Sequence, residues 1–223
     1  MGLHGTKAIL LDFDGPVCGV FSGFPAHDVA ASLVKAMSEA SVDVPERIAV
    51  EPDPLEVLRY AATLGRPDIL MLVEDNLRAA ELIAVASAEP TVGASQVMES
   101  SVSRGLRVAV VSNNSAQAID VYLSMHHLTH LISAVVGREY ANPDAMKPNP
   151  QPVHNVVSQL GLTGAECVLV GDSTTDVVAA NAAEVSCIGY ANKTNKRADL
   201  ASVGAIAIIE SMYELADELA RVH

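Results

Sequence analysis

The chain has 223 residues, of which half are hydrophobic and 18% are charged. This composition suits one domain, or a core with a smaller insert, and argues against an intrinsically disordered protein. The formal net charge of −13 argues against nucleic acid and anionic membranes as partners, because no basic stretch offsets it. Aromatic residues are scarce and Trp is absent, so we expect a core of aliphatic strands and Ala-rich helices.

The sequence shows no segment typical of export or membrane insertion. The N-terminal stretch MGLHGTK has no apolar signal core, and no apolar run approaches the ~20 residues of a membrane span. Of the three cysteines, Cys167 and Cys187 lie in apolar runs and are expected to be small buried side chains. We therefore expect a cytoplasmic protein with reduced cysteines and no membrane partner.

Six short apolar runs predict buried β-strands. They are Ala8–Phe13, Val108–Val111, Ala134–Val136, Val168–Val170, Cys187–Gly189 and Ala207–Ile209. Helical patterns lie between or after the later runs, at Ala116–Ser124, Pro152–Leu160, Thr175–Ala183 and Met212–Val222. This alternation predicts an α/β fold, with a Rossmann-like parallel sheet and helices on both of its faces.

The stretch between the first and second strands has a different character. Between Ala26 and Ala88 it carries three helical stripes of apolar residues, separated by Pro and Gly, and no strand pattern. Thr91–Arg104 then predicts a helix that returns to the sheet. We expect a core domain of residues 1–17 and 89–223, with residues 18–88 inserted as an all-helical unit, called the helical insert below.

Two carboxylates follow the first predicted strand. Asp12 and Asp14 lie two positions apart in an extended segment, so both side chains can point to the same side. Ligands of open parallel sheets bind at the carboxyl ends of the strands. One carboxylate can serve as a nucleophile or metal ligand and the other can move a proton. A solvated Asp-Gly-Pro turn is the alternative.

Polar side chains follow the next two predicted strands. Ser112 and Asn113 stand before a helix, where free N–H groups and the helix dipole favour phosphate, although plain N-capping is the alternative. Lys147, in the restrained segment MKPNP, can offset the charge of carboxylates and of a phosphate, although a lone Lys is usually solvated.

Asp172 and Asp176 follow the fourth predicted strand, in the segment VLVGDSTTD. Gly171 allows a close backbone approach, and the two carboxylates are one helical turn apart. Mg²⁺ prefers such oxygen ligands, whereas an N-cap with an acidic first turn is the alternative. Since four successive strands end in reactive residues, one sheet edge is expected to collect them in a single site.

These motifs resemble those of the haloacid dehalogenase superfamily of hydrolases. The resemblance covers the whole chain: DFDGP at 12–16, VVSNN at 110–114, KPNP at 147–150 and GDSTTD at 171–176, in the family's order. The helical insert is similar to the α-helical cap of the subgroup that contains phosphoglycolate phosphatases and β-phosphoglucomutases. The resemblance implies a phosphate-monoester hydrolase that acts on a small phosphorylated metabolite.

It also implies a role for each matching residue. Asp12 would attack phosphorus and form an aspartyl-phosphate, while Asp14 would protonate the leaving oxygen and then activate water. Ser112 and the Asn113 backbone N–H would hold phosphate oxygens. Lys147 would pair with Asp12 and with the phosphate.

The implied cofactor is Mg²⁺. Its ligands would be Asp12, the Asp14 backbone carbonyl and Asp172, with Asp176 in support. Val17–Pro25 stands at the place of the family's mobile flap. At position 16 this chain has Pro where Thr or Val is commoner in the family. This difference concerns the backbone geometry where the chain enters the flap.

Other activities remain open at this stage. A hydrolytic dehalogenase lacks the second Asp and needs no metal, so Asp14 and Asp172 argue against it. A phosphonate hydrolase needs a reactive lysine in the insert, where the only one, Lys35, shares a polar helical face with Ser32 and Glu39. A phosphomutase, or an inactive binding protein with this fold, is not distinguished by the motifs.

The insert is expected to set substrate specificity. Arg47 and Arg66 stand in expected inter-helix loops and are candidates for binding a second anionic group of the substrate. The alternative is that both are solvated.

Overall fold

The structure, a computed structural model, describes residues 3–221. Its centre is a six-stranded sheet in which all neighbouring strands are parallel, in the order β5-β4-β1-β6-β7-β8. The strands are β1 (Ala8–Leu11), β4 (Arg107–Val111), β5 (Ala134–Val136), β6 (Cys167–Gly171), β7 (Ser186–Tyr190) and β8 (Ala207–Ile209). A separate antiparallel pair consists of β2 (Cys18–Gly19) and β3 (Glu89–Pro90).

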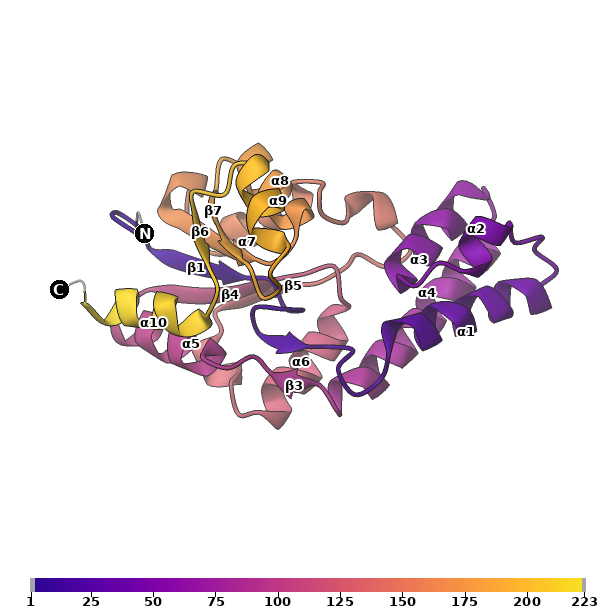
Figure 1. Cartoon of the computed structure of the whole chain (residues 1–223), viewed down its shortest axis with the longest axis horizontal. Coiled ribbons are helices and arrows are strands. Elements are labelled where there is room, and N and C mark those ends of the chain that lie inside the picture. Colours follow the sequence, from indigo (N-terminus) through magenta and orange to yellow (C-terminus); the bar gives the residue numbers. More distant parts are fainter. Residues whose placement is uncertain (1–2, 222–223) are drawn as a thin grey trace.

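Helices cover both faces of the sheet and form a lobe at one end of the molecule (Figure 1). The α-helices are α1 (Ala26–Glu39), α2 (Glu46–Ala49), α3 (Pro54–Thr63), α4 (Pro67–Val85), α5 (Ala94–Ser103), α6 (Ala116–Met125), α7 (Gln151–Gln159), α8 (Thr174–Ala182), α9 (Lys196–Ser202) and α10 (Met212–Arg221). Short 3-10 helices are η1 (Thr129–Leu131), η2 (Pro143–Ala145) and η3 (Gly164–Glu166). The expected α/β class is therefore confirmed.

Alternate residues of each central strand enter different layers of the core. In β1, Ile9 and Leu11 pack with α5, α6 and α10, whereas Ala8 and Leu10 pack with α7, α8 and α9. All four side chains are fully buried, since side chains of a strand point alternately to its two faces. A strand buried on both sides must be apolar throughout, which explains the continuous run AILL.

The helical insert has a hydrophobic cluster of its own. Buried residues of α1, α2, α3 and the first half of α4 form it, among them Leu33, Leu58 and Leu77. The C-terminal end of α4 belongs instead to the core cluster, through Ala84 and Val85. Helix α4 is thus one continuous rod that joins the insert to the α/β core, as its course in Figure 1 shows. The boundaries at 17/18 and 88/89 stay a prediction.

Some elements differ from the sequence expectations. The first strand ends at Leu11 rather than Phe13, and β2 and β3 form a ribbon that two residues per strand could not reveal in the sequence. Helix α9 was not predicted, because Leu200 is its one buried residue among those described and it has no apolar stripe. The expected end of the last helix, Val222, lies outside the described residues.

No helix within residues 3–221 has both the length and the apolar character of a membrane span.

Candidate active site

A cavity of about 400 Å³ opens at the carboxyl ends of β1, β4 and β6, where the helical insert faces the sheet. The core contributes Asp12, Asp14, Ser112, Asn113, Asn114, Lys147, Asp172, Ser173, Thr175 and Asp176 to its lining. The opposite wall comes from Phe21, Ala26, Pro52, Asp53, Pro54, Leu55, Glu56 and Arg59. Three strand ends meet here as expected, and Lys147 joins them from beyond η2 rather than from the end of β5. Each of the sequence-predicted core residues lines this cavity.

Lys147 lies at the floor of the cavity and is 1% exposed. Its Nζ is 2.9 Å from Asp12 Oδ1 and 2.5 Å from Asp176 Oδ1, and it donates to the Val111 carbonyl at 3.0 Å. Burial lowers the pKa of Lys147, but the two carboxylates outweigh this effect and raise the pKa above its ordinary value. The side chain is therefore a fixed positive charge beside Asp12.

Asp12 is the central carboxylate and is 8% exposed. Its Oδ1 accepts a hydrogen bond from the Phe13 N–H at 2.7 Å. Burial and the nearby Asp176 carboxylate raise the pKa of Asp12 to about 7, although Lys147 opposes the shift. An excess of negative charge is thus concentrated here, and a bound cation would relieve it.

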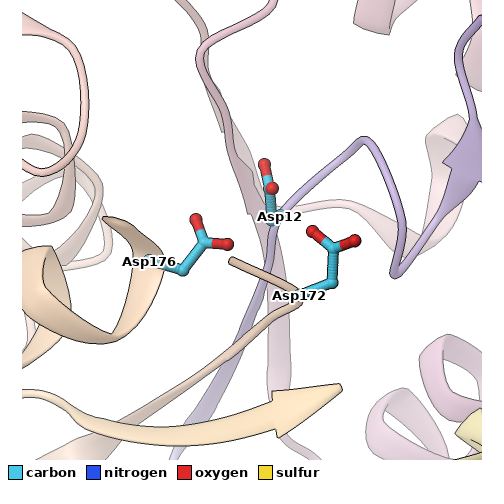
Figure 2. Close-up of side chains that lie close together, drawn as sticks. All are labelled: Asp12, Asp172 and Asp176. Carbon is cyan, nitrogen blue, oxygen red and sulfur yellow. The ribbon is translucent and has the colours of Figure 1, made fainter. Parts of the chain in front are cut away.

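Three carboxylates at the cavity have the arrangement of a cation site. Oxygen atoms of Asp12, Asp172 and Asp176 lie within 4.8 Å of one another, and the side chains point toward a common space in Figure 2. Asp176 Oδ1 is buried, yet beyond its ion pair with Lys147 it takes part in no hydrogen bond with the described residues. Hard carboxylate oxygens, one of them buried with Lys147 as its one partner among the described residues, fit Mg²⁺.

The Asp14 side chain lies apart from this group of three oxygens. Its Oδ1 accepts a hydrogen bond from the Val20 N–H at 2.9 Å, while the carboxyl group faces the cavity. Desolvation by the surrounding protein and the nearby Asp172 carboxylate raise the pKa of Asp14 to about 6, although the hydrogen bond from Val20 opposes the shift. A carboxyl group with such a pKa can both donate and accept a proton near neutral pH.

Two glycines allow the carboxylates to approach the backbone. Gly15 has a φ of +102°, and a Cβ there would lie 2.5 Å from Asp172 Cγ. A Cβ on Gly171 would collide with the Asp176 side chain. Any larger residue at either position would push a site carboxylate away, so the expected close approach at Gly171 is confirmed.

The loop after β4 connects two parts of the site. Ser112 Oγ hydrogen-bonds to Asn114 Oδ1 at 3.2 Å, and both residues line the cavity. The Asn113 side chain donates to the Lys147 carbonyl at 3.1 Å and accepts from the Lys147 N–H at 2.8 Å. Asn113 therefore fixes the backbone of the lysine segment, a function that its position in the sequence did not reveal.

The end of this loop is a helix N-cap. Ser115 Oγ accepts from the Ala118 N–H, and the Ser115 N–H donates to Glu81 Oε2 at 3.0 Å. The N–H of the N-cap residue of α6 is therefore occupied by a carboxylate of α4. Ser115 therefore caps the helix, whereas Ser112 and Asn113 line the cavity, and phosphate binding by these two residues stays a prediction.

Neither arginine proposed for substrate binding lies at the cavity. Arg47 is exposed on α2 and lies over the Tyr60 ring, with Cζ 5.9 Å from the ring centroid. Arg66 is exposed and pairs with its neighbour Asp68 at 2.5 Å. The expectation for both residues is corrected, because the short α2 and the start of α4 direct these side chains elsewhere.

Arg59 of α3 lies at the cavity instead. It donates to the Lys147 carbonyl at 2.9 Å and to the Pro143 carbonyl at 3.3 Å, and it pairs with Glu56. Within the sequence, Glu56 and Arg59 are three residues apart and look like an ordinary surface pair. Only the packing of α3 against η2 places this guanidinium at the active-site edge.

Two further polar residues come from the segment after β7. Lys196 Nζ lies 2.5 Å from Asp172 Oδ2, and Asn192 Nδ2 donates to the same oxygen at 2.9 Å. Both side chains hold Asp172 Oδ2 in place. Neither contact was predicted from the sequence, because NKTNK has no pattern that identifies its partners.

The segment Val17–Pro25 begins as a well-anchored structure. Val17, Cys18 and Val20 are buried in the core cluster. The Val17 carbonyl accepts from the Thr91 N–H at 3.0 Å, and the Thr91 hydroxyl donates to the Gly15 carbonyl at 2.5 Å. The first residues of this segment are thereby tied to the β3 region.

The comparisons with known proteins agree with this geometry. The sequence pattern of the family described as haloacid dehalogenase-like hydrolase matches residues 53–190. A phosphoglycolate phosphatase of Rhodospirillum rubrum is 29% identical over 228 aligned residues, which cover 96% of this chain and 90% of the relative.

Solved structures show the same fold. A predicted phosphatase from Clostridium acetobutylicum has a TM-score of 0.71 at 15% identity, over 97% of this chain and 99% of that one. A hydrolase of this family from Deinococcus radiodurans, solved with bound phosphate and sodium, has a TM-score of 0.63 at 23% identity, over 97% and 96% of the two chains. This chain belongs to the haloacid dehalogenase-like hydrolases, as its motifs implied.

Proposed function

We propose that the protein is a Mg²⁺-dependent phosphatase that hydrolyses a small phosphorylated metabolite through an aspartyl-phosphate on Asp12. The observation that carries the proposal is the arrangement of Lys147 between Asp12 and Asp176, at the floor of a cavity that Asp14 also faces. The phosphoglycolate phosphatase of R. rubrum and the phosphate bound in the D. radiodurans structure support a phosphate-monoester substrate.

In the first half of the proposed reaction, an Asp12 carboxylate oxygen attacks phosphorus. The bond from phosphorus to the ester oxygen breaks, and Asp14 gives its proton to that oxygen, so that an alcohol leaves. Lys147 holds Asp12 in position and offsets the negative charge of the phosphate. Ser112 and Asn113 bind the phosphate oxygens from the β4 side.

In the second half, Asp14 takes a proton from water while the water oxygen attacks the phosphorus of the aspartyl-phosphate. The bond from phosphorus to Asp12 breaks, which releases inorganic phosphate and restores the carboxylate. The raised pKa of Asp14, about 6, suits a group that donates a proton first and accepts one later. The cavity wall from the helical insert limits the access of bulk water.

Mg²⁺ would be held by Asp12 and Asp172 with Asp176, and when bound it would neutralise phosphate charge and so help a carboxylate approach phosphorus. We retain the expected Asp14 backbone carbonyl as a further ligand. We also propose residues 18–88 as a cap domain on the core of 1–17 and 89–223, because the insert supplies one wall of the cavity.

Hydrolysis of p-nitrophenyl phosphate with and without Mg²⁺ tests the proposal. We expect turnover that EDTA abolishes and that Asp12→Asn reduces by at least about 10³-fold, because an amide is a poor nucleophile. Asp75→Asn, an exposed change on α4, is the control and should keep full activity. Full activity of Asp12→Asn would show that Asp12 is not the nucleophile.

A panel of phosphorylated organic acids and sugars then identifies the substrate. A phosphatase releases inorganic phosphate from one of them with a much higher kcat/KM than from p-nitrophenyl phosphate. A mutase returns an isomeric sugar phosphate instead, and an inactive binding protein gives neither product.

A further inference from the structure

A cluster of charged side chains is buried between α4 of the helical insert and the segment after β5. The side chains of Glu74, Glu81 and Arg138 all have zero exposure. Burying three charges is costly unless they are paired and hydrogen-bonded, so their placement requires a compensating set of contacts.

Arg138 satisfies both carboxylates. It binds Glu81 with two nitrogens, Nη1 to Oε1 at 2.7 Å and Nη2 to Oε2 at 3.3 Å. Its Nε donates to both oxygens of Glu74 at 3.2 Å. Arg78, also on α4, adds a hydrogen bond to Glu74 at 2.6 Å and one to the Arg138 carbonyl at 3.1 Å.

The same cluster holds the loop that lines the phosphate side of the cavity. Arg138 Nη1 donates to the Asn113 carbonyl at 2.7 Å, and the Arg138 N–H donates to the Asn114 carbonyl at 2.8 Å. Glu81 accepts from the Ser115 N–H at 3.0 Å and from Asn114 Nδ2 at 3.4 Å. Two buried side chains therefore fix three consecutive residues.

We propose that Glu81 and Arg138 are positioning residues that hold the Ser112–Ser115 loop ready to bind the substrate's phosphate, so that α4 forms part of the phosphate-binding apparatus. The proposal rests on the proposed phosphatase function. Groups that stabilise a phosphate act best when they are fixed before it binds, and a displacement of about 1 Å can cost ~100-fold in rate. Neither residue touches the phosphate itself.

The pairing also explains why an acidic side chain is tolerated so close to an anion site. An unpaired Glu81 carboxylate behind this loop would repel phosphate. Arg138 offsets its charge at 2.7 Å, and the Ser115 N–H and Asn114 amide share the remaining acceptor capacity. The loop gains a rigid support without a net negative charge.

Glu74 provides a matched control. It lies seven residues before Glu81 on the same helix, is equally buried and binds the same arginine. Within the described part of the chain, it makes no hydrogen bond to residues 112–115. A merely structural cluster would respond alike to changes at Glu74 and Glu81, whereas a positioning role is confined to Glu81 and Arg138.

The test compares Glu81→Gln with Glu74→Gln in the full-length protein with Mg²⁺. KM and kcat for p-nitrophenyl phosphate, the inhibition constant of inorganic phosphate and the melting temperature are measured. We expect both variants to lose thermal stability. Glu81→Gln should raise KM and the phosphate inhibition constant about tenfold, whereas Glu74→Gln should leave both within about twofold.

Arg138→Lys supplies a second measurement that does not depend on how Glu81→Gln folds. It keeps the charge but loses the forked contact to Glu81 and the Asn113 carbonyl, so it should also weaken phosphate inhibition about tenfold. Unchanged phosphate inhibition in Glu81→Gln or Arg138→Lys, or equal weakening in Glu74→Gln, overturns the proposal.

Failure of the underlying function has a different signature. In that case the wild-type protein does not hydrolyse p-nitrophenyl phosphate at all. Calorimetric titration of the wild type and both Gln variants with inorganic phosphate then decides the positioning proposal alone: selective weakening in Glu81→Gln supports it, and equal binding in all three refutes it.

Discussion

Two buried cations of this protein each lie between a pair of carboxylates. Lys147 lies between Asp12 and Asp176 at the floor of the cavity, and Arg138 lies between Glu74 and Glu81 behind the Ser112–Ser115 loop. Both clusters join residues that are far apart in the sequence.

The two clusters differ in how completely their polar atoms are satisfied. Around Arg138 each carboxylate oxygen accepts at least one hydrogen bond, and the side chains are closed to solvent. Around Lys147 the cluster opens on the cavity, Asp176 Oδ1 has Lys147 as its one partner among the described residues, and the pKa of Asp12 is raised to about 7. A closed cluster supports structure, whereas an open and incompletely satisfied one is suited to bind a cation and a substrate.

Replacing Arg138 or Lys147 by Met, which removes the positive charge from one cluster at a time, is the strongest test of this contrast. Arg138→Met should lower the free energy of unfolding by about 3–5 kcal/mol with or without Mg²⁺, because it leaves buried carboxylates unpaired. Lys147→Met should cost about as much without metal, but Mg²⁺ should restore part of the loss, and activity should fall by ~10²–10³-fold or more. Urea unfolding in EDTA and in Mg²⁺ measures both. Equal recovery of the two variants by Mg²⁺ would contradict the distinction.

The pH dependence of the stability of the metal-free protein is a further test of the difference between the two clusters. The pKa of Asp12 is raised from 3.8 to about 7, so the folded state favours its protonated form. Its contribution to stability is therefore complete below pH ~4 and is lost as the pH rises through about 7. In EDTA, Asp12→Asn should be more stable than wild type at pH 8, by on the order of a few kcal/mol, and the difference should vanish near pH 4.

The control for this measurement is the closed cluster. Glu74→Gln should be less stable than wild type at pH 8, because its partners Arg138 and Arg78 lose a charged acceptor. Thermal unfolding at several pH values gives both differences. If Asp12→Asn were destabilising at pH 8 in EDTA, the open site would not carry the excess negative charge described above.

Metal binding should stabilise the open cluster alone. At a Mg²⁺ concentration of about 100 times Kd, the wild-type protein should gain ~2.7 kcal/mol, equivalent to roughly 5–10 °C in melting temperature for a chain of this size. Asp172→Asn should remove most of this gain. Asp217→Asn, an exposed change on α10, should keep it. A gain that survives Asp172→Asn would place the cation elsewhere.

The smallest expected effect concerns the contact of α3 with the site. Arg59→Met removes hydrogen bonds to the carbonyls of Pro143 and Lys147, so it should raise KM for p-nitrophenyl phosphate by roughly two- to fivefold, equivalent to about 0.4–1 kcal/mol. Arg47→Met and Arg66→Met should leave KM unchanged, since both side chains lie away from the cavity. If Arg47→Met or Arg66→Met raised KM more than Arg59→Met does, the original assignment of that arginine to substrate binding would be restored.

Much of the core could be predicted because its signals are local. A strand buried on both faces must be apolar throughout, so runs such as Ala8–Leu11 identify it without knowledge of the fold. Parallel strands share an edge at their carboxyl ends, so Asp12, Ser112 and Asp172 could be assigned to one site from their positions after three strands.

The edges of the site could not be predicted in this way. Arg47 and Arg66 were the candidates that the sequence suggested, yet of the three arginines Arg47, Arg59 and Arg66 it is Arg59 that lines the cavity. Which side chain faces the core depends on the packing angle of α3 and on the course of η2, and neither has a local signal. The contact of Lys196 with Asp172, which lies 24 residues earlier in the sequence, also has no local signal.

The sequence by itself determined the α/β architecture, the residues at the strand ends and the family to which the chain belongs, because periodicity and short motifs are properties of neighbouring residues. The tertiary structure decided that Lys147 is buried between two carboxylates and that Glu81 and Arg138 contact the Ser112–Ser115 loop. Those contacts join residues at least 25 positions apart in the sequence, and the charge of a side chain does not reveal its partner until the chain has folded.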